Sequence, residues 1–248
     1  MGIGGYALIM DQDLWIGAVR HGESTANVAA AEAARDGLDL IDITQREADV
    51  PLSDLGRRQA ESLGRRLGEV AAAERPDLVL VSPFLRARQT AELAVGALDI
   101  ATKVDERLRD RDLGILDLHT AQGIRAQFPE EAERRRHHGK FYYRPPGGES
   151  WTDVALRLRA VLREIEQDAP GRRVLIVAHD VVVALVRYIL EELDEKVLME
   201  RASSEPVSNA SLSSWVRRSD GWRCEAFNDV SHVEADPEAR ATAEEPVR

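Results

Sequence analysis

The chain has 248 residues, of which 44% are hydrophobic and 31% are charged, a composition typical of a water-soluble globular protein. Its 33 basic and 44 acidic residues give a formal net charge of −11, which argues against a general affinity for nucleic acid or anionic membranes. Any anion site must therefore be local. The single cysteine, Cys224, excludes an intrachain disulfide and any multi-cysteine metal site, and we expect it to be a buried bystander.

The N-terminal stretch "MGIGGYALIMDQDLW" has neither the positively charged region nor the long apolar core of a secretory signal. No later run approaches the roughly 18 consecutive apolar residues of a membrane-spanning helix. We therefore expect a cytoplasmic protein that has no membrane partner.

Five short apolar runs along the chain are typical of strands. Those at 15–19, 78–81 and 174–178 are continuously apolar, as in strands that are buried on both faces of a sheet. The runs at 212–216 and 222–227 follow near the C-terminal end. Because longer helical patterns separate the first three runs, they indicate parallel strands joined by helical crossovers.

Amphipathic patterns between and after these runs predict helices. One helix is expected at about 54–73, with Ser53 as its N-cap. A second begins after Ser150, where Asp153 can complete a short capping box, and a third covers about 181–193. The predicted fold is a three-layer α/β/α sandwich around a mostly parallel sheet.

The segment 105–149 differs from the rest, because it mixes acidic and basic residues and ends in a stretch rich in glycine and proline. We expect an inserted excursion over the active site. Residues 1–234 are predicted to form a single domain that includes this insertion. Residues 235–248 contain no aromatic side chain and are predicted to be a disordered tail.

Three predicted strands end in residues that suit anion chemistry: Arg20 and His21, then Ser82, then His179. In open α/β sheets, ligands bind beyond the carboxyl ends of the strands. If the three strands are parallel neighbours, their ends share one crevice, and the helix after Ser82 brings Arg86 to it. Two arginines, two histidines and a helix N-terminus would then surround one point, which suits a phosphate group.

Five motifs carry a resemblance to a known family. In order and spacing, "RHGEST" with Asn27, "PLSDLGRRQA", "SPFLRARQTA", "GGES" and "VAHD" resemble the histidine phosphatase superfamily, also called the phosphoglycerate mutase-like family. The resemblance covers about residues 14–233. It implies that His21 is the nucleophile that forms a phosphohistidine, and neutral imidazole is chemically suited to that role near pH 7.

The resemblance also implies roles for the other residues at the strand ends. Arg20, Arg86 and His179 would hold the phosphoryl oxygens and stabilise the charge of the transition state. Additional hydrogen-bond donors to the substrate are expected from the residues that follow His21, namely Ser24, Thr25 and Asn27.

A leaving alkoxide needs a proton from a carboxyl group. The family carries its acid four residues before a glycine, and "RLRDRDLG" places Asp110 there, where glutamate is usual. Because aspartate is one methylene shorter, Glu106 and Asp112 are the alternatives. Asp180 stands where relatives usually carry a small residue; it could orient His179, repel phosphate or cap the following helix, and we favour capping.

Two further features flank the predicted site. The cluster 134–138 is interpreted as a solvated helical face, and its adjacent His137 and His138 would diverge on a helix. No spacing supports a zinc site, so we predict neither a metal nor another cofactor. Arg144, whose backbone is restrained by prolines, is predicted to contact the substrate beyond its phosphate.

Together these features predict a phosphomonoester hydrolase that acts through a covalent phosphohistidine on a small phosphorylated metabolite. A phosphoglycerate mutase-type phosphoryl transfer is the first alternative. A binding module that has kept the phosphate site and lost turnover is the second. No nucleic-acid partner is expected, and the sequence makes no prediction of oligomeric state.

Overall fold

The computed structural model describes residues 13–168 and 171–243. In this part of the chain, six strands form one sheet in the order β3-β2-β4-β1-β5-β6. They are β1 (Trp15–Arg20), β2 (Leu78–Val81), β3 (Ala101–Val104), β4 (Arg173–Ala178), β5 (Leu212–Arg218) and β6 (Gly221–Asp229). Strands β1 to β4 are parallel, whereas β5 runs antiparallel to β1 and β6 antiparallel to β5. The mostly parallel sheet is confirmed.

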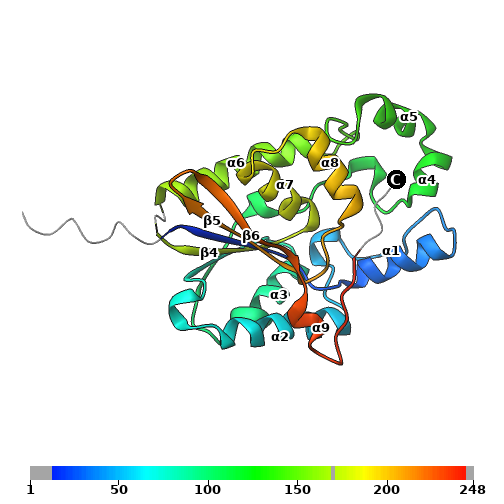
Figure 1. Cartoon of the computed structure of the whole chain (residues 1–248). Coiled ribbons are helices and arrows are strands. Elements are labelled where there is room, and N and C mark those ends of the chain that lie inside the picture. The colour runs from blue at the N-terminus through cyan, green and yellow to red at the C-terminus, as the bar shows by residue number, and fades with distance from the viewer. Residues whose placement is uncertain (1–12, 169–170, 244–248) are drawn as a thin grey trace, which may run out of the picture.

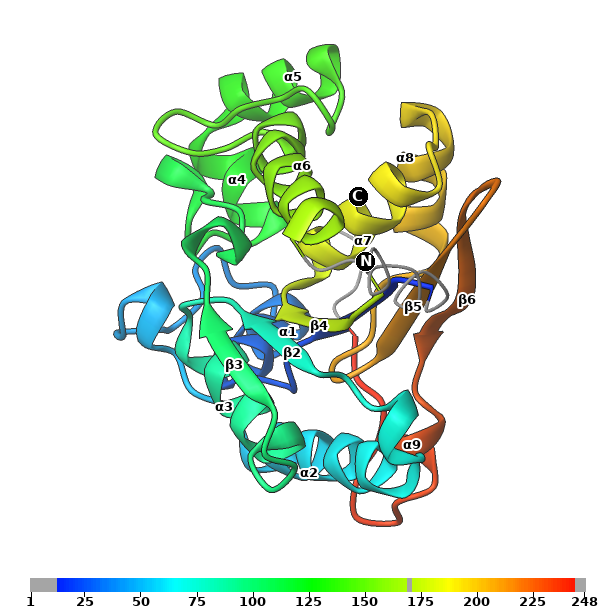
Figure 2. The same ribbon diagram turned by 90° about the vertical axis from the view of Figure 1, so that its left-hand side faces the viewer.

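Helices cover both faces of this sheet, as the predicted sandwich requires (Figure 1, Figure 2). Helices α2, α3 and α9 lie on one face, and α6, α7 and α8 lie on the other. The helices are α1 (Thr25–Arg35), α2 (Asp54–Glu69), α3 (Leu85–Val95), α4 (Ala121–Gln127), α5 (Pro129–His138), α6 (Trp151–Asp168), α7 (Asp180–Leu190), α8 (Glu195–Ser204) and α9 (Ser231–Glu234).

The predicted helix starts are confirmed by their caps. The Ser53 hydroxyl accepts a hydrogen bond of 3.0 Å from the backbone N–H of Gly56 at the start of α2. At the start of α6, the Ser150 hydroxyl accepts from the N–H of Asp153, and the Asp153 carboxylate accepts from the N–H of Ser150. Each cap satisfies backbone donors that have no partner inside the helix.

The sheet separates two apolar cores, because successive side chains of a strand point to opposite faces. Ile16 and Ala18 of β1 pack with Ile176 of β4 in the core beneath α6 and α7. Val19 and Val177 belong to the opposite core, with the buried side chains of α2 and α3. Continuous apolar runs in the sequence thus arise from strands that are covered on both faces.

Two features of the sheet edges differ from expectation. Strand β3 was not predicted, because all four of its residues are exposed and show no apolar pattern. Cys224 was predicted to be buried, and this is wrong: it is exposed on β6, the edge strand whose central residues lie outside the cores. Edge strands need only backbone pairing on one side, so their sequences carry a weaker signal.

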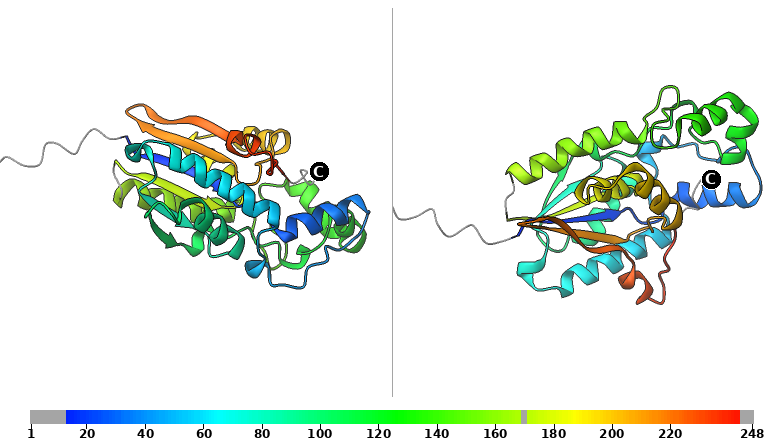
Figure 3. Two further views of the ribbon diagram at one scale, coloured as in Figure 1. Left: turned by 90° about the horizontal axis from the view of Figure 1, so that it is seen from below. Right: turned by 45° about the horizontal axis from the view of Figure 1, so that its top comes forward.

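The insertion 105–149 lies at the carboxyl end of the parallel strands, on the same side as α1 (Figure 3). It contains α4 and α5, and the buried side chains of Leu108, Phe141 and Tyr143 anchor it. Among the helices of the described part of the chain, none combines the length and apolar composition that a bilayer crossing requires.

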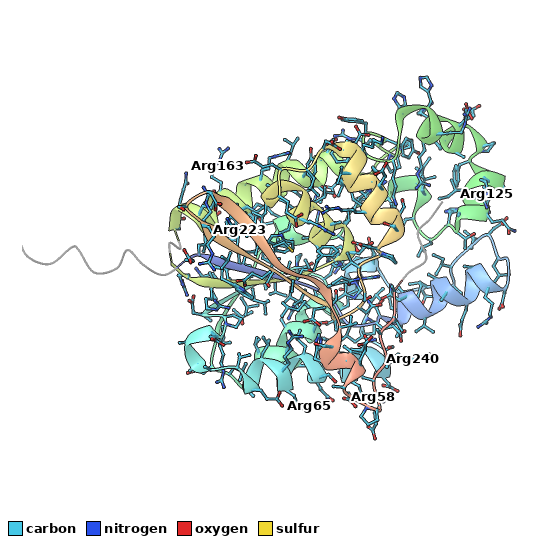
Figure 4. All side chains as sticks on the ribbon, in the orientation of Figure 1. Arg58, Arg65, Arg125, Arg163, Arg223 and Arg240 are labelled. Atoms are coloured by element: carbon cyan, nitrogen blue, oxygen red, sulfur yellow. The ribbon has the colours of Figure 1, made fainter. Side chains whose placement is uncertain are left out.

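The predicted disordered tail differs from the structure over 235–243, which packs beside α2 (Figure 4). Asp236 accepts a hydrogen bond from the Ser62 hydroxyl, and Gln59 donates to the backbone carbonyl of Arg240. Such contacts use backbone groups and small polar side chains, which composition does not reveal. Residues 244–248 of the predicted tail lie outside the described residues. So do residues 1–12, which form most of the N-terminal stretch that was compared with a secretory signal.

Candidate active site

His21 lies directly after β1, where its backbone N–H donates to the carbonyl of Ala178 on the neighbouring β4. Its Nδ1 is 2.7 Å from the carbonyl oxygen of Gly22, so this nitrogen carries the proton. Its Nε2 accepts a hydrogen bond of 3.2 Å from Nε of Arg86. Burial first, and then the charges of Arg86, His179 and Arg20, hold the pKa of His21 well below its usual value. His21 is therefore neutral at pH 7, and Nε2 carries the lone pair, which is directed toward Arg86.

His179 ends β4, and its ring centroid is 5.2 Å from that of His21. The two histidines are 158 positions apart in the chain and meet because β1 and β4 are adjacent and parallel. Nε2 of His179 is 2.8 Å from the Ser82 hydroxyl, and Nδ1 is 3.1 Å from Oδ2 of Asp110. Burial lowers the pKa of His179 and outweighs the opposing effect of Asp110. The predicted meeting of the strand ends is confirmed.

Arg86 stands on the first turn of α3 and is buried, whereas its neighbour Arg88 is exposed, as the helical spacing predicts. Its guanidinium carbon lies 4.9 Å from the ring centre of Phe84. Arg86 donates from Nη2 to Oδ2 of Asp110 at 2.9 Å and to Oε1 of Glu47 at 3.2 Å. One guanidinium thus joins the nucleophile candidate to two carboxyl groups.

Of the three acids considered from the sequence, Asp110 is the one that lies in this cluster, since Glu106 and Asp112 are both exposed. Its Oδ2 contacts Arg86 and His179, and its Oδ1 accepts from the backbone N–H of Arg111. Burial would raise the pKa of Asp110, but these contacts outweigh it and hold the pKa well below its usual value. Asp110 is therefore ionised in this arrangement.

Arg20 points to the opposite face of β1 from His21, because consecutive residues of a strand alternate. Its Nη1 donates to the carbonyl of Val207 at 2.7 Å. It lines a cavity of about 110 Å³ together with Lys140, Trp151 and Asp180. Arg20 and Asp180 are the chain neighbours of His21 and His179, but neither histidine is among the residues that line this cavity.

The capping role predicted for Asp180 is wrong. His179 itself occupies the N-cap position of α7, without a side-chain hydrogen bond, and Asp180 is the first helical residue. A carboxylate in the first turn still interacts favourably with the helix dipole. Its side chain lines the cavity beside Lys140.

The three donors predicted after His21 have different surroundings. Ser24 and Asn27 form the capping box of α1: the Ser24 hydroxyl accepts from the Asn27 N–H, and Asn27 Oδ1 accepts from the Ser24 N–H. Ser24 is thereby committed to the helix start. The hydroxyl of Thr25, the first residue of α1, is buried and has no hydrogen-bond partner among the described residues, so, unlike that of Ser24, it is not committed to the helix start.

The structure does not bring Arg144 to the histidine pair. Its side chain is 62% exposed and pairs with Asp153 at the start of α6.

In the cluster 134–138, most side chains are exposed as predicted, but Arg135 is half-buried and its pKa is lowered by burial. Arg111 and Lys140 are also partly buried with lowered pKa values, and repulsion from Arg135 contributes to both.

Three supporting residues escaped prediction from the sequence. Glu47, on the short 3-10 helix η1 (Glu47–Asp49), reaches Arg86 from the loop between α1 and α2. Thr90 accepts from the N–H of Gly22, and Asn209 donates to the carbonyl of His21 at 3.1 Å. Thr90 lies inside the motif "SPFLRARQTA", so its position in that motif could have identified it as a residue of the site. Nothing in the sequence around Glu47 or Asn209 distinguishes them from ordinary loop residues.

Over the described ranges 13–168 and 171–243, no group of three histidine, cysteine, aspartate or glutamate side chains could hold a metal ion. The cluster is instead rich in cationic and neutral hydrogen-bond donors, a set that suits an anion. With its buried neutral imidazole, it can support attack on a phosphorus atom and stabilise the charge that develops on the phosphoryl oxygens.

Comparisons with known proteins agree with this chemistry. Residues 16–230 match the model of the histidine phosphatase superfamily (branch 1). "Probable phosphoglycerate mutase GpmB" of Klebsiella pneumoniae is 31% identical over 221 residues, which cover 88% of this chain and 94% of that protein. Its counterpart in Erwinia tasmaniensis is 28% identical over 221 residues, covering 87% of this chain and 93% of that protein.

Solved structures give a similar picture. A mycobacterial glucosyl-3-phosphoglycerate phosphatase in complex with VO3 is 27% identical, with a TM-score of 0.69, over 86% of this chain and 98% of that one. The alpha-ribazole phosphatase from Shigella flexneri has a TM-score of 0.69 at 21% identity, over 87% of this chain and 96% of that one. This second likeness concerns the fold alone.

Proposed function

Because the chain belongs to the histidine phosphatase superfamily, we propose that it hydrolyses phosphomonoesters through a phosphohistidine on His21. The observation that carries the proposal is the neutral His21 ring, whose Nε2 faces the guanidinium of Arg86 and lies beside His179. Nε2 attacks phosphorus as the bond to the alcohol oxygen breaks. Water then attacks phosphorus, the bond to Nε2 breaks, and inorganic phosphate leaves.

Hydrogen-bond donors and positive charges around His21 would support the phosphoryl group during both steps. Arg86 and His179 would donate to its oxygens, and such preorganised donors are usually the largest electrostatic contribution to catalysis. Arg20, on the opposite face of β1, would contribute through its charge. Oδ2 of Asp110 now occupies the position between Arg86 and His179. These contacts hold Arg86 and His179 beside the His21 ring, where the phosphoryl group would bind.

The departing oxygen needs a proton, and the incoming water must lose one. The family resemblance assigns both transfers to Asp110. Glu47 shares the same guanidinium, so two carboxyl groups lie beside the proposed reaction centre. Neither transfer requires a metal ion or a cofactor.

A small, acidic metabolite fits the surroundings best. Burial and repulsion from Arg135 lower the pKa values of Arg111 and Lys140, so the approach of an anionic group would be favourable beside them. Asp180 already opposes this effect at both residues. Substrates with a second anionic group, such as the glucosyl-3-phosphoglycerate for which the mycobacterial phosphatase is named, are therefore preferred candidates.

Phosphoglycerate mutase activity is the second candidate function, and it is favoured by the names of the relatives. A mutase must shield its phosphohistidine from water, whereas the side chains of Asp110 and Glu47 are 20% and 38% exposed. Water access to these carboxyl groups favours hydrolysis. Incubation with 3-phosphoglycerate decides between the two: release of phosphate supports a phosphatase, and isomerisation to 2-phosphoglycerate without release supports a mutase.

The first prediction concerns the covalent step. With a labelled phosphomonoester and EDTA, quenching in base should trap an acid-labile adduct on His21. Substitution His21→Ala should abolish the adduct and lower turnover by at least about 10³-fold, since the nucleophile is lost. The variant should keep its far-ultraviolet circular dichroism spectrum. Binding of phosphate without any adduct, across a broad panel of phosphomonoesters, would instead indicate a binding module.

A further inference from the structure

The Arg86 guanidinium binds the nucleophile candidate and two carboxyl groups at once. Its Nε contacts Nε2 of His21, and its Nη2 contacts the carboxylates of both Asp110 and Glu47. Its Nη1 also donates to the backbone carbonyl of Glu47 at 2.9 Å, which fixes the position of the loop that carries this residue. Only one guanidinium group separates either carboxyl group from Nε2 of His21.

The two carboxyl groups have opposite surroundings. Asp110 accepts hydrogen bonds from Arg86 and the Arg111 N–H and lies 3.1 Å from Nδ1 of His179, and all three contacts stabilise its ionised form. The Glu47 carboxyl group contacts Arg86 alone among cationic side chains of the described residues, and the acids Asp110 and Asp117 face it. Burial first, and then the charge of Asp110, raise the pKa of Glu47 to about 7 against the effect of Arg86.

Such a pair is a recognisable catalytic arrangement, because carboxyl groups whose pKa values are pushed apart take different roles. A group that must give a proton and later accept one works best when its pKa is near the operating pH. Glu47 meets this condition and Asp110 does not. The half-exposed position of Glu47 also gives it access to water, the second reactant of the hydrolysis.

We propose that Glu47 is the catalytic acid and base of this site, and that Asp110 is a positioning residue for Arg86 and His179. The proposal rests on the phosphohistidine mechanism above. As the phosphorus–oxygen bond breaks, Glu47 gives its proton to the departing alcohol oxygen. In the second step the Glu47 carboxylate takes a proton from water as the water oxygen bonds to phosphorus and the bond to Nε2 breaks. Both His21 and Glu47 then return to their starting states.

The test compares two leaving groups in the variant Glu47→Gln. An alkyl phosphate such as 3-phosphoglycerate needs a proton on its departing oxygen, whereas the nitrophenolate of p-nitrophenyl phosphate departs without one. We expect kcat/KM for the alkyl phosphate to fall by about 10²–10⁴-fold. The loss for p-nitrophenyl phosphate should be at least tenfold smaller. Asp49→Asn is the matched control: Asp49 lies on the same 3-10 helix, is exposed and pairs with Arg46, so both activities should stay within twofold of the parent.

Asp110→Asn should show a different pattern. Because Asp110 is proposed to position Arg86 and His179, its loss should lower the activity toward both substrates by similar factors. A selective loss with the alkyl phosphate in Asp110→Asn, or an equal loss with both substrates in Glu47→Gln, would overturn the assignment. Unchanged activity of Glu47→Gln would overturn it as well.

The pH profile gives a second readout, which is independent of the comparison of leaving groups. In the parent protein, kcat/KM for the alkyl phosphate should fall as the pH rises through about 7, because Glu47 loses the proton it must donate. This limb should disappear in Glu47→Gln, while any limb from the second ionisation of the substrate phosphate, near pH 6, should remain. A limb that persists unchanged in the variant would contradict the proposal.

Trapping separates this inference from the mechanism on which it depends. With p-nitrophenyl phosphate, Glu47→Gln should still form the adduct on His21, because that leaving group needs no proton. If the parent protein forms no adduct on His21, the phosphohistidine mechanism itself fails. If the parent forms it and Glu47→Gln hydrolyses both substrates normally, only the role of Glu47 fails.

Discussion

At the scale of single residues, the reactivity of His21 depends on which ring nitrogen holds the proton. The Gly22 carbonyl binds Nδ1, which leaves Nε2 as the acceptor toward Arg86. Gly22 is itself held by Thr90, whose buried hydroxyl accepts from the Gly22 N–H at 3.0 Å and donates to the carbonyl of Arg86 at 2.7 Å. One hydroxyl thus ties the backbone of the nucleophile loop to that of the arginine helix.

The substitution Thr90→Val tests this link, because it keeps the shape of the side chain and removes only the hydroxyl. The buried N–H of Gly22 would lose its partner, and the free energy of unfolding should fall by about 1–3 kcal/mol. We expect kcat to fall by roughly tenfold as His21 loses its fixed orientation. Thr90→Ser keeps the hydroxyl and should retain most of the activity. Equal activity of the valine and serine variants would show that the hydroxyl does not matter.

At the scale of elements, the site depends on how closely α2 approaches the loop after β1. A β-carbon on Gly56, at the start of α2, would overlap the backbone of Glu23, and one on Gly22 would overlap the carbonyl of Gly56. The Ser53 N–H also donates to the carbonyl of Glu23 at 2.9 Å. These neighbours are backbone atoms, which cannot move aside as a flexible side chain can. The position of the nucleophile loop is therefore set by α2.

Gly56→Ala should separate these two elements. We expect a loss of about 2–4 kcal/mol in the free energy of unfolding, together with reduced turnover, because the added methyl group forces backbone to shift. Gly68→Ala in the same helix is the control: its β-carbon would meet nothing closer than Leu98 at 4.0 Å. Alanine is the better helix former, so this variant should gain up to about 1 kcal/mol. Chemical denaturation measures both changes, and similar values for the two variants would refute the packing argument.

At the scale of the whole molecule, buried titratable side chains make the stability of the fold depend on pH. His21, His179 and His232 are buried, and burial is the first cause that lowers the pKa of each. A histidine whose pKa is lower in the folded state binds fewer protons than it does when unfolded, so folding stability falls as the pH drops below about 6.5. Glu47 acts in the opposite sense, because its folded pKa is raised and its contribution is lost as the pH rises toward 7.

The three histidines should outweigh the single glutamate between pH 7.5 and 5.5. Each contributes at most about 1.4 kcal/mol per pH unit, so urea denaturation should give a free energy of unfolding that is lower at pH 5.5 by a few kcal/mol. The variant His21→Ala should show a smaller difference between the two pH values. Equal or greater stability of the parent protein at pH 5.5 would contradict this account.

The sequence by itself determined the buried parallel strands β1, β2 and β4, the caps of α2 and α6, and the residues that meet at the ends of these strands. These features leave strong local signals: continuous apolar runs, helical periodicity, and reactive residues placed directly after strands. Parallel pairing of β1, β2 and β4 then follows from general rules of connection, which is why His21, Arg86 and His179 could be grouped in advance.

Only the tertiary structure decided which loops complete the site. Glu47, Asn209 and the segment around Thr242 are held there by hydrogen bonds between distant parts of the chain, and no local pattern encodes such contacts. The protonation states of Glu47 and Asp110 were also undetermined, because a pKa depends on burial and on charges that arrive from other elements. Periodicity reports which face of an element is buried, but the partners of a loop carboxyl group depend on the packing of the whole chain.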